Sequence, residues 1–272
     1  MLLEKKINKT KSFIAKILFL LFFLASTKSY SFNIQEVADS VFVHYGIQEE
    51  TNAYNKGDIA NIGFIIGKDS IMVIDTGGTQ LIGRKLLEKI RTISNLPISH
   101  IVITHSHPDH FLGTQAFSDE NAKIVGHEKL NRSLVNNFEF YRNLQYTNIE
   151  LEEIKNLKLV EAEVLVKTNQ KKIIDLGERL IELKAWKSGH TDNDLSIYDL
   201  KTKTFWSENV FVKRTPSIRA SIIGWKKNLE DIMKMDIKLI VPGHGKAISK
   251  IEAIKPMMNY FDRLIEQVRN FH

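Results

Sequence analysis

The residues best suited to chemistry lie in one short segment, residues 104–110, with the sequence Thr-His-Ser-His-Pro-Asp-His. The segment holds three imidazoles, those of His105, His107 and His110, and the carboxylate of Asp109. Neutral imidazole and carboxylate are ligands that suit zinc, with iron and manganese as competitors. The alternative is a polar loop that merely happens to be rich in histidine. The density of these groups favours a metal site over that alternative.

The spacing of these side chains predicts two neighbouring ions. Side chains two positions apart on an extended segment point the same way, so His105 and His107 can bind one ion. Asp109 and His110 follow where the chain turns, and they can reach a second ion beside the first. The apolar run at 101–103 predicts a short buried strand that ends at this site.

Two further histidines follow predicted strands much later in the chain. His190 comes after the predicted strand 180–186, and His244 comes after the predicted strand 237–241 and is flanked by glycines. We expect His190 to complete three protein ligands on the first ion, which leaves an open position for water, as in catalytic zinc sites. We expect His244 to join the aspartate and the last histidine of segment 104–110 on the second ion.

The pattern His-x-His-x-Asp-His resembles the signature of the metallo-β-lactamase superfamily. Three further stretches, at 61–64, 73–78 and 126–128, resemble the SoxH-like zinc metallohydrolases associated with the quinoprotein relay. The resemblance runs from about Phe42 to the C-terminus. It implies a fold of the α/β (α+β) class, the αββα four-layer metallo-β-lactamase sandwich. In that fold two sheets face each other, helices lie outside them, and the metals lie at one edge between the sheets.

The resemblance also implies roles for two residues outside the histidine segment. Asp75 ends a predicted strand, and its expected role is to hold the histidine loop rather than to bind metal itself. Many members of the superfamily have a Gly-Asp pair whose aspartate bridges two metals, and Glu208 and Asn209 stand at that place here. An amide is neutral and a poor bridging ligand. The sequence therefore predicts two Zn²⁺ ions, the second in a weakened site.

Two other features near the expected site have ordinary explanations, which we favour. The predicted helical stretch 127–146 carries aromatic residues that could form a wall or lid over the site, but core packing is the favoured interpretation. Lys213 and Arg214 could meet a substrate carboxylate, but surface charge is the favoured interpretation for both.

Residues 1–31 have the pattern of a secretory signal peptide. Lysines precede a short apolar run at 17–25, and small residues follow at Ser29 and Ser31. Because the run is too short to span a bilayer comfortably, we expect cleavage before Phe32 and no stable membrane span afterwards. An uncleaved N-terminal anchor is the alternative. We expect the mature protein to be one domain over residues 32–272 and to be periplasmic or secreted.

Removal of this leader changes the charge of the chain. The whole chain has 38 basic and 32 acidic residues, and the leader contains six lysines and one glutamate. The remaining chain therefore has 32 basic and 31 acidic residues, a net charge of +1 with histidine neutral. This near-neutral balance gives no support to a nucleic-acid partner. The chain has no cysteine, which excludes disulfides, thiol catalysis and cysteine metal ligands.

These observations predict an exported zinc-dependent hydrolase that uses a metal-bound hydroxide on a carbonyl-type small-molecule substrate. Asp109 is expected to be catalytic, orienting the proton of the nucleophile, as well as a ligand. One alternative is a metallo-β-lactamase that hydrolyses β-lactams. Another is a non-catalytic metal-binding accessory protein of a periplasmic redox system, and the resemblance implies a possible link to periplasmic quinoprotein systems. An iron-dependent oxygen- or sulfur-handling enzyme is disfavoured, because the diiron oxygen-reducing relatives usually carry a glutamate where His107 stands.

Overall fold

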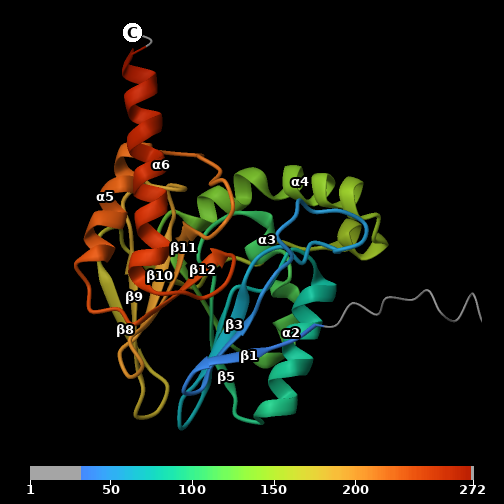
Figure 1. The fold of residues 1–272 in the computed structure, drawn as a ribbon. Coiled ribbons are helices and arrows are strands. Elements are labelled where there is room, and N and C mark those ends of the chain that lie inside the picture. The colour runs from blue at the N-terminus through green and yellow to red at the C-terminus, as the bar shows by residue number, and fades with distance from the viewer. Residues whose placement is uncertain (1–31, 271–272) are drawn as a thin grey trace, which may run out of the picture. The chain divides into compact units, whose positions relative to one another are not determined.

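Two β-sheets form the centre of the fold in the computed structural model, which describes residues 32–270 (Figure 1). The predicted signal peptide lies outside the described residues. Within them the first sheet has the strand order β1-β2-β3-β4-β5-β6-β7, and the second has the order β12-β11-β10-β9-β8. The strands of the first sheet are β1 (Gln35–Ala38), β2 (Val41–His44), β3 (Ile62–Ile66), β4 (Ile71–Ile74), β5 (Ile98–Val102), β6 (Lys123–His127) and β7 (Val164–Val166). The strands of the second are β8 (Lys171–Asp175), β9 (Leu180–Ala185), β10 (Leu195–Asp199), β11 (Thr204–Phe211) and β12 (Leu239–His244).

The burial pattern of each strand follows from its place and pairing in the sheet. Strands β1 to β4 are antiparallel, whereas β4 to β7 are parallel and need crossover segments between them. Every residue of β4 is buried, as expected for a central strand that is covered on both faces. In β9 buried and less buried residues alternate, which is typical of a strand with one covered face.

Helices cover the outer faces of both sheets. Helix α2 (Gln80–Ile93) turns Ile82, Leu86 and Ile90 inward, and its first turn is capped by the Thr79 side chain, which accepts a hydrogen bond from the Ile82 amide. Helices α5 (Ile222–Met233) and α6 (Lys250–Asn270) pack against each other, and α6 contacts β11 and β12 (Figure 1). The remaining helical segments are α3 (Pro108–Phe111), η1 (Thr114–Glu120), α4 (Leu130–Ile149) and η2 (Glu152–Asn156).

Two hydrophobic clusters match this layering. One fills the space between the sheets, with Val43, Met72 and Ile74 from the first sheet against Leu183, Ile197 and Trp206 from the second. The other lies between the second sheet and helices α5 and α6, and it includes Phe205, Trp225, Leu229 and Phe261. The expected four-layer αββα arrangement is therefore confirmed. Along residues 32–270, no helix combines the length and the apolar character needed to cross a membrane.

The two sheets are joined by hydrogen bonds at one edge. The Leu195 amide donates to the carbonyl of Thr104 across the sheets at 2.8 Å. A second set of bonds comes from Asn61, just before β3. Its main-chain amide donates to Gly243 O at 2.8 Å, and its side-chain Nδ2 donates to Pro242 O and Gly245 O at 2.8 and 2.6 Å. These contacts fix the spacing of the strand ends that carry the histidines.

Candidate metal centre

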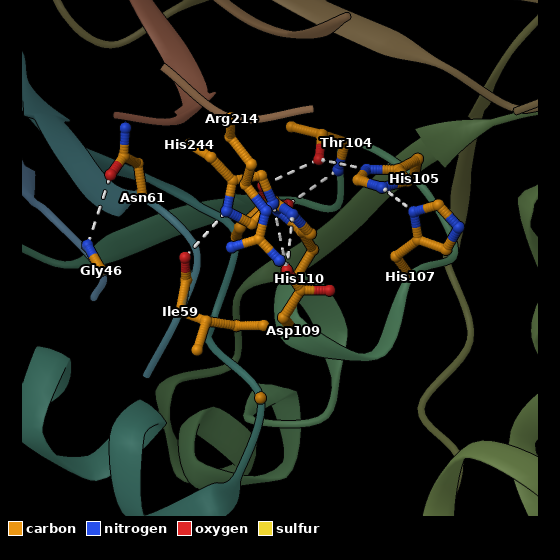
Figure 2. A network of polar contacts seen from close by, with 12 residues as sticks. Gly46, Ile59, Asn61, Thr104, His105, His107, Asp109, His110, Arg214 and His244 are labelled. Atoms are coloured by element: carbon orange, nitrogen blue, oxygen red, sulfur yellow. Dashed lines mark hydrogen bonds and ion pairs between the residues drawn. The ribbon is translucent and has the colours of Figure 1, made fainter. Parts of the chain in front are cut away.

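The first histidine cluster is formed by His105, His107 and His190. His105 and His107 follow the end of β5, and His190 lies between β9 and β10. One ring nitrogen of each converges on the same point, and these atoms lie within 4.8 Å of one another. His107 Nδ1 is 2.8 Å from His105 Nε2 (Figure 2). It is 3.0 Å from His190 Nε2. The structure thus brings together the three residues expected to hold the first ion.

The second cluster is formed by Asp109, His110 and His244. Asp109 and His110 lie in α3, and His244 ends β12 in the other sheet. Asp109 Oδ2 is 3.4 Å from His110 Nε2 and 3.3 Å from His244 Nε2 (Figure 2). The ligand atoms of this group also lie within 4.8 Å of one another. These are the residues expected to hold the second ion.

The hydrogen bonds of the other ring nitrogens determine which nitrogen faces each cluster. The Nδ1–H groups of His190 and His244 donate to the main-chain carbonyls of Ser217 and Ile59, at 2.9 and 2.8 Å. A carbonyl only accepts, so in the neutral rings Nδ1 carries the proton and Nε2 keeps a free lone pair. Such orientation by a partner on the far nitrogen is usual for metal-binding histidines.

The short distances between the ring nitrogens of the first cluster are better explained by a bound cation than by hydrogen bonds among the three rings. The Thr104 hydroxyl donates to Asp75 Oδ2 at 2.7 Å, so its oxygen accepts from His105 Nδ1 at 3.2 Å and leaves His105 Nε2 bare. His105 Nε2 and His190 Nε2 therefore both present lone pairs to His107 Nδ1, which can donate to only one of them. A cation among the three nitrogens removes that repulsion. The donor set fits zinc.

Burial sets the charge states of these groups. It lowers the pKa of His105 and His190 well below the usual range, and it lowers the pKa of His107 and of His244 to about 4, so all four are neutral near pH 7. Burial opposes ionisation of Asp109, but the charges of His110 and His244 and the hydrogen bond from His110 outweigh it and lower the pKa of that carboxyl. Neutral imidazoles and an ionised carboxylate are the forms that bind metal.

Asp75 connects the two clusters without belonging to either. It is fully buried after β4 and accepts hydrogen bonds from the Thr104 amide at 2.9 Å, the Thr104 hydroxyl at 2.7 Å and His110 Nδ1 at 2.8 Å. Its φ of 53° lies in the left-handed region, which is uncommon for a residue with a side chain. Burial raises the pKa of Asp75, while the contacts with His110 and Thr104 favour the ionised form. One carboxylate thus orients a histidine of each cluster, directly for His110 and through Thr104 for His105.

Asn209 is buried in β11, close in sequence to residues that contact both clusters. Its main-chain carbonyl accepts a hydrogen bond from Trp225 Nε1 at 2.8 Å, but its side-chain Oδ1 has no hydrogen-bond partner among the described residues. Two residues later, the Phe211 ring packs against the rings of His190 and His244, with centroid distances of 5.1 and 5.2 Å. Strand β11 continues to Phe211, because its pairing with β12 resumes there after an irregularity.

A cavity of about 430 Å³ opens over the clusters and is lined by His107, Asp109 and His244. Helix α4 contributes Tyr141 and Leu144 to it, so the favoured interpretation of core packing is wrong for these two residues and correct for the buried Phe138. The sequence could not show this, because α4 both buries apolar residues such as Leu134 and Phe138 and lines the cavity with their neighbours.

The loop between β11 and α5 supplies two arginines to the cavity. Arg214 lines it beside His244 (Figure 2), so the favoured interpretation of surface charge is wrong for Arg214, whereas Lys213 is exposed outside the cavity. Arg219 also lines the cavity, and no motif in the sequence distinguishes it from other arginines.

Asp194, which was not among the residues expected from the sequence, shapes the loop of His190. Asp194 is buried and accepts hydrogen bonds from the Thr191 amide at 3.0 Å and from the Thr191 hydroxyl at 2.5 Å. Burial raises the pKa of Asp194 to about 7, against the effect of these hydrogen bonds. A threonine followed three positions later by aspartate, directly after a candidate ligand, was the signal that could have revealed this turn.

The sequence of the chain is similar to one family model and to two known proteins. Residues 55–244 match the family model of the metallo-beta-lactamase superfamily. The chain is 22% identical over 229 residues to the probable metallo-hydrolase YqjP of Bacillus subtilis (strain 168), a match that covers 73% of this chain and 70% of that one. A 56-residue stretch is 45% identical to the linear primary-alkylsulfatase of Pseudomonas sp. (strain ATCC 19151), but it covers 20% of this chain and spans 11% of the alkylsulfatase.

Solved structures show the same fold. The metallo-beta-lactamase from Pontibacter korlensis superposes with a TM-score of 0.68 at 16% sequence identity, covering 85% of this chain and 99% of that one. At this level of identity the similarity establishes the shared architecture.

Proposed function

This chain belongs to the metallo-beta-lactamase superfamily, and we propose that it is an exported, zinc-dependent hydrolase of a small-molecule substrate with a carbonyl-type electrophile. The observation that carries the proposal is the pair of three-residue clusters at the floor of the cavity, with ligand atoms no more than 4.8 Å apart in each. Export is supported by the sequence pattern of residues 1–31 alone. A link to periplasmic quinoprotein systems stays a prediction.

Zinc bound at these clusters would lower the pKa of a coordinated water toward neutrality and stabilise negative charge that develops on the substrate. His105, His107 and His190 would hold one ion, and Asp109, His110 and His244 would hold the other. The anchored Nδ1–H groups keep the imidazoles in place without further ordering when metal arrives. The Asp109 carboxylate, whose Oδ2 lies next to His110 and His244, can accept and orient the proton of an attacking water through its other oxygen.

The cavity supplies the rest of the site. Phe211 packs against His190 and His244 and adds an apolar surface to the lining beside the clusters. The opening is large enough for a small molecule, because ligand sites of this kind occupy roughly 300–1,000 Å³. The similarity to β-lactamases lies in the fold, so β-lactams are one substrate class to test among several.

The test combines metal analysis with turnover. The chain beginning at Phe32 is loaded with zinc, and its zinc content is measured by elemental mass spectrometry. Hydrolysis of activated ester, thioester, lactone and β-lactam substrates is then measured before and after chelation. We expect bound zinc and a chelator-sensitive turnover of at least one class, restored when zinc is returned. Bound zinc without any turnover would favour the accessory-protein alternative, and absence of bound zinc would refute the mechanism.

A further inference from the structure

The loop between β11 and α5, residues 212–221, is fastened to both clusters by main-chain contacts. The Val212 amide donates to the carbonyl of His244 at 3.0 Å. Ser217 O accepts from His190 Nδ1 at 2.9 Å, and the Arg219 amide donates back to His190 O at 3.2 Å. The main chain of Arg219 is therefore held next to a residue of the first cluster, and its side chain lines the cavity.

The two arginines of this loop differ in their partners. Arg214 Nη1 donates to Glu49 O at 3.1 Å, and Arg214 Nη2 pairs with the Glu50 carboxylate at 3.0 Å. The Arg219 guanidinium, by contrast, has no hydrogen-bond or ion-pair partner within residues 32–270. Its charge still reaches the site, since it contributes to lowering the pKa of His107, for which burial is the main cause.

Tyr141, from helix α4, lines the same cavity as Arg219. Burial raises the pKa of Tyr141, Arg219 lowers it and Asp109 raises it, so the hydroxyl lies within reach of both charges. Leu144, one helical turn later, also lines the cavity, and 41% of its surface is exposed. The lining of the cavity thus combines a cation that has no partner among the described residues, an apolar surface and residues of both metal clusters.

We propose that Arg219 determines substrate specificity, and that the substrate carries an oxyanion, a carboxylate, phosphate or sulfate group, joined to an apolar part. Arg219 binds the oxyanion with its fork of N–H donors, and the apolar part lies against Tyr141 and Leu144. The scissile bond then lies over the two clusters. This inference rests on the proposed hydrolase function, because it names the substrate class of the same cavity.

The experiment compares matched charged and neutral compounds. Zinc-loaded protein is assayed with 4-nitrophenyl hemisuccinate and with 4-nitrophenyl butyrate, which differ mainly in the terminal carboxylate. Binding of phenylacetate, phenyl phosphate, phenyl sulfate and neutral phenylacetamide is measured by calorimetry. The variants are Arg219→Gln and Arg219→Lys, with Lys213→Gln as the control because it removes a positive charge from the same loop outside the cavity.

We expect the wild-type protein to hydrolyse the hemisuccinate faster than the butyrate, and Arg219→Gln to reduce that preference about tenfold. This is the size expected for the loss of a charge-assisted hydrogen bond at a site that is partly exposed to solvent. Arg219→Lys should restore part of the preference, and Lys213→Gln should leave it unchanged. The order of binding among the three anions identifies the oxyanion. No charge preference in the wild-type protein, or an equal loss in Arg219→Gln and Lys213→Gln, would overturn the inference.

The binding arm separates this inference from the proposed function. If no ester is hydrolysed, but an anion binds better than phenylacetamide to the wild-type protein and not to Arg219→Gln, the hydrolase proposal fails and the Arg219 assignment stands. If both esters are hydrolysed at rates that Arg219→Gln leaves unchanged, the hydrolase proposal stands and the Arg219 assignment fails.

Discussion

The floor and the rim of the cavity are built on different physical principles. At the floor, His190, His244 and Asp75 are buried, and each makes hydrogen bonds that fix its orientation. At the rim, Arg219 and Tyr141 present polar groups that find no hydrogen-bond partner in the described part of the chain. Groups at the floor are already ordered to bind a cation, whereas groups at the rim are available to a substrate. Substitutions at the floor should therefore impair metal binding, and substitutions at the rim should impair substrate selection.

The largest effect is expected from loss of a direct metal ligand. His107→Ala removes the nitrogen on which the first cluster converges, and we expect loss of one zinc and a fall in turnover on the order of 10³-fold or more. Elemental mass spectrometry and the ester assay measure the two effects. His100→Ala is the matched control, because His100 is half-buried in β5 and belongs to neither cluster. Equal zinc content in both variants would contradict the assignment of the floor.

A smaller effect is expected from Asp75, which touches ligands without being one. Asp75→Asn keeps the size of the side chain and tolerates the left-handed backbone. It removes the charge and replaces one of the two acceptor oxygens by an N–H donor. Because His110 and Thr104 lose their charged acceptor, we expect zinc affinity to fall about 10- to 100-fold. Competition with a chromophoric chelator measures this. Asp75→Ala should be worse, through added backbone strain. If Asp75→Asn bound zinc as tightly as the wild-type protein, Asp75 would contribute only to the stability of the fold.

The same contrast explains how much could be predicted from the sequence. The floor was predictable because its residues follow or end hydrophobic strands: His105 and His107 follow β5 of the first sheet, and His244 ends β12 of the second. These strand ends lie at the same edge of the two sheets, where the clusters form. The rim was not, because Tyr141, Leu144 and Arg219 reach the cavity only through the path of α4 and of loop 212–221. Those paths depend on tertiary contacts such as Arg219 N to His190 O, which no local pattern encodes.

Asn209 tests whether the floor is complete. Its Oδ1 is a buried acceptor without a donor in the described structure, which is uncommon and marks the position as incompletely satisfied. If Asn209 weakens the second zinc site, Asn209→Asp should supply a negative charge there and raise the affinity for the second ion about tenfold. Zinc titration followed by elemental analysis measures the change, with Asn228→Asp as a control at another buried asparagine, which lies in α5 and belongs to neither cluster. An unchanged second site would mean that Asn209 does not face the ions.

The smallest effect is expected at the rim, from the Tyr141 hydroxyl. Tyr141→Phe removes one hydrogen-bonding group from the cavity and leaves the apolar wall, so it separates polar recognition from packing. A neutral hydrogen bond contributes about 0.5–1.5 kcal/mol, so we expect kcat/KM to fall about three- to tenfold while zinc content stays unchanged. Tyr146→Phe is the matched control, since its hydroxyl donates to Glu152 at 3.1 Å outside the cavity. A loss of zinc in Tyr141→Phe would erase the distinction between floor and rim. An equal fall in kcat/KM in both variants would mean that Tyr141 acts through the packing of α4 and not through contact with the substrate.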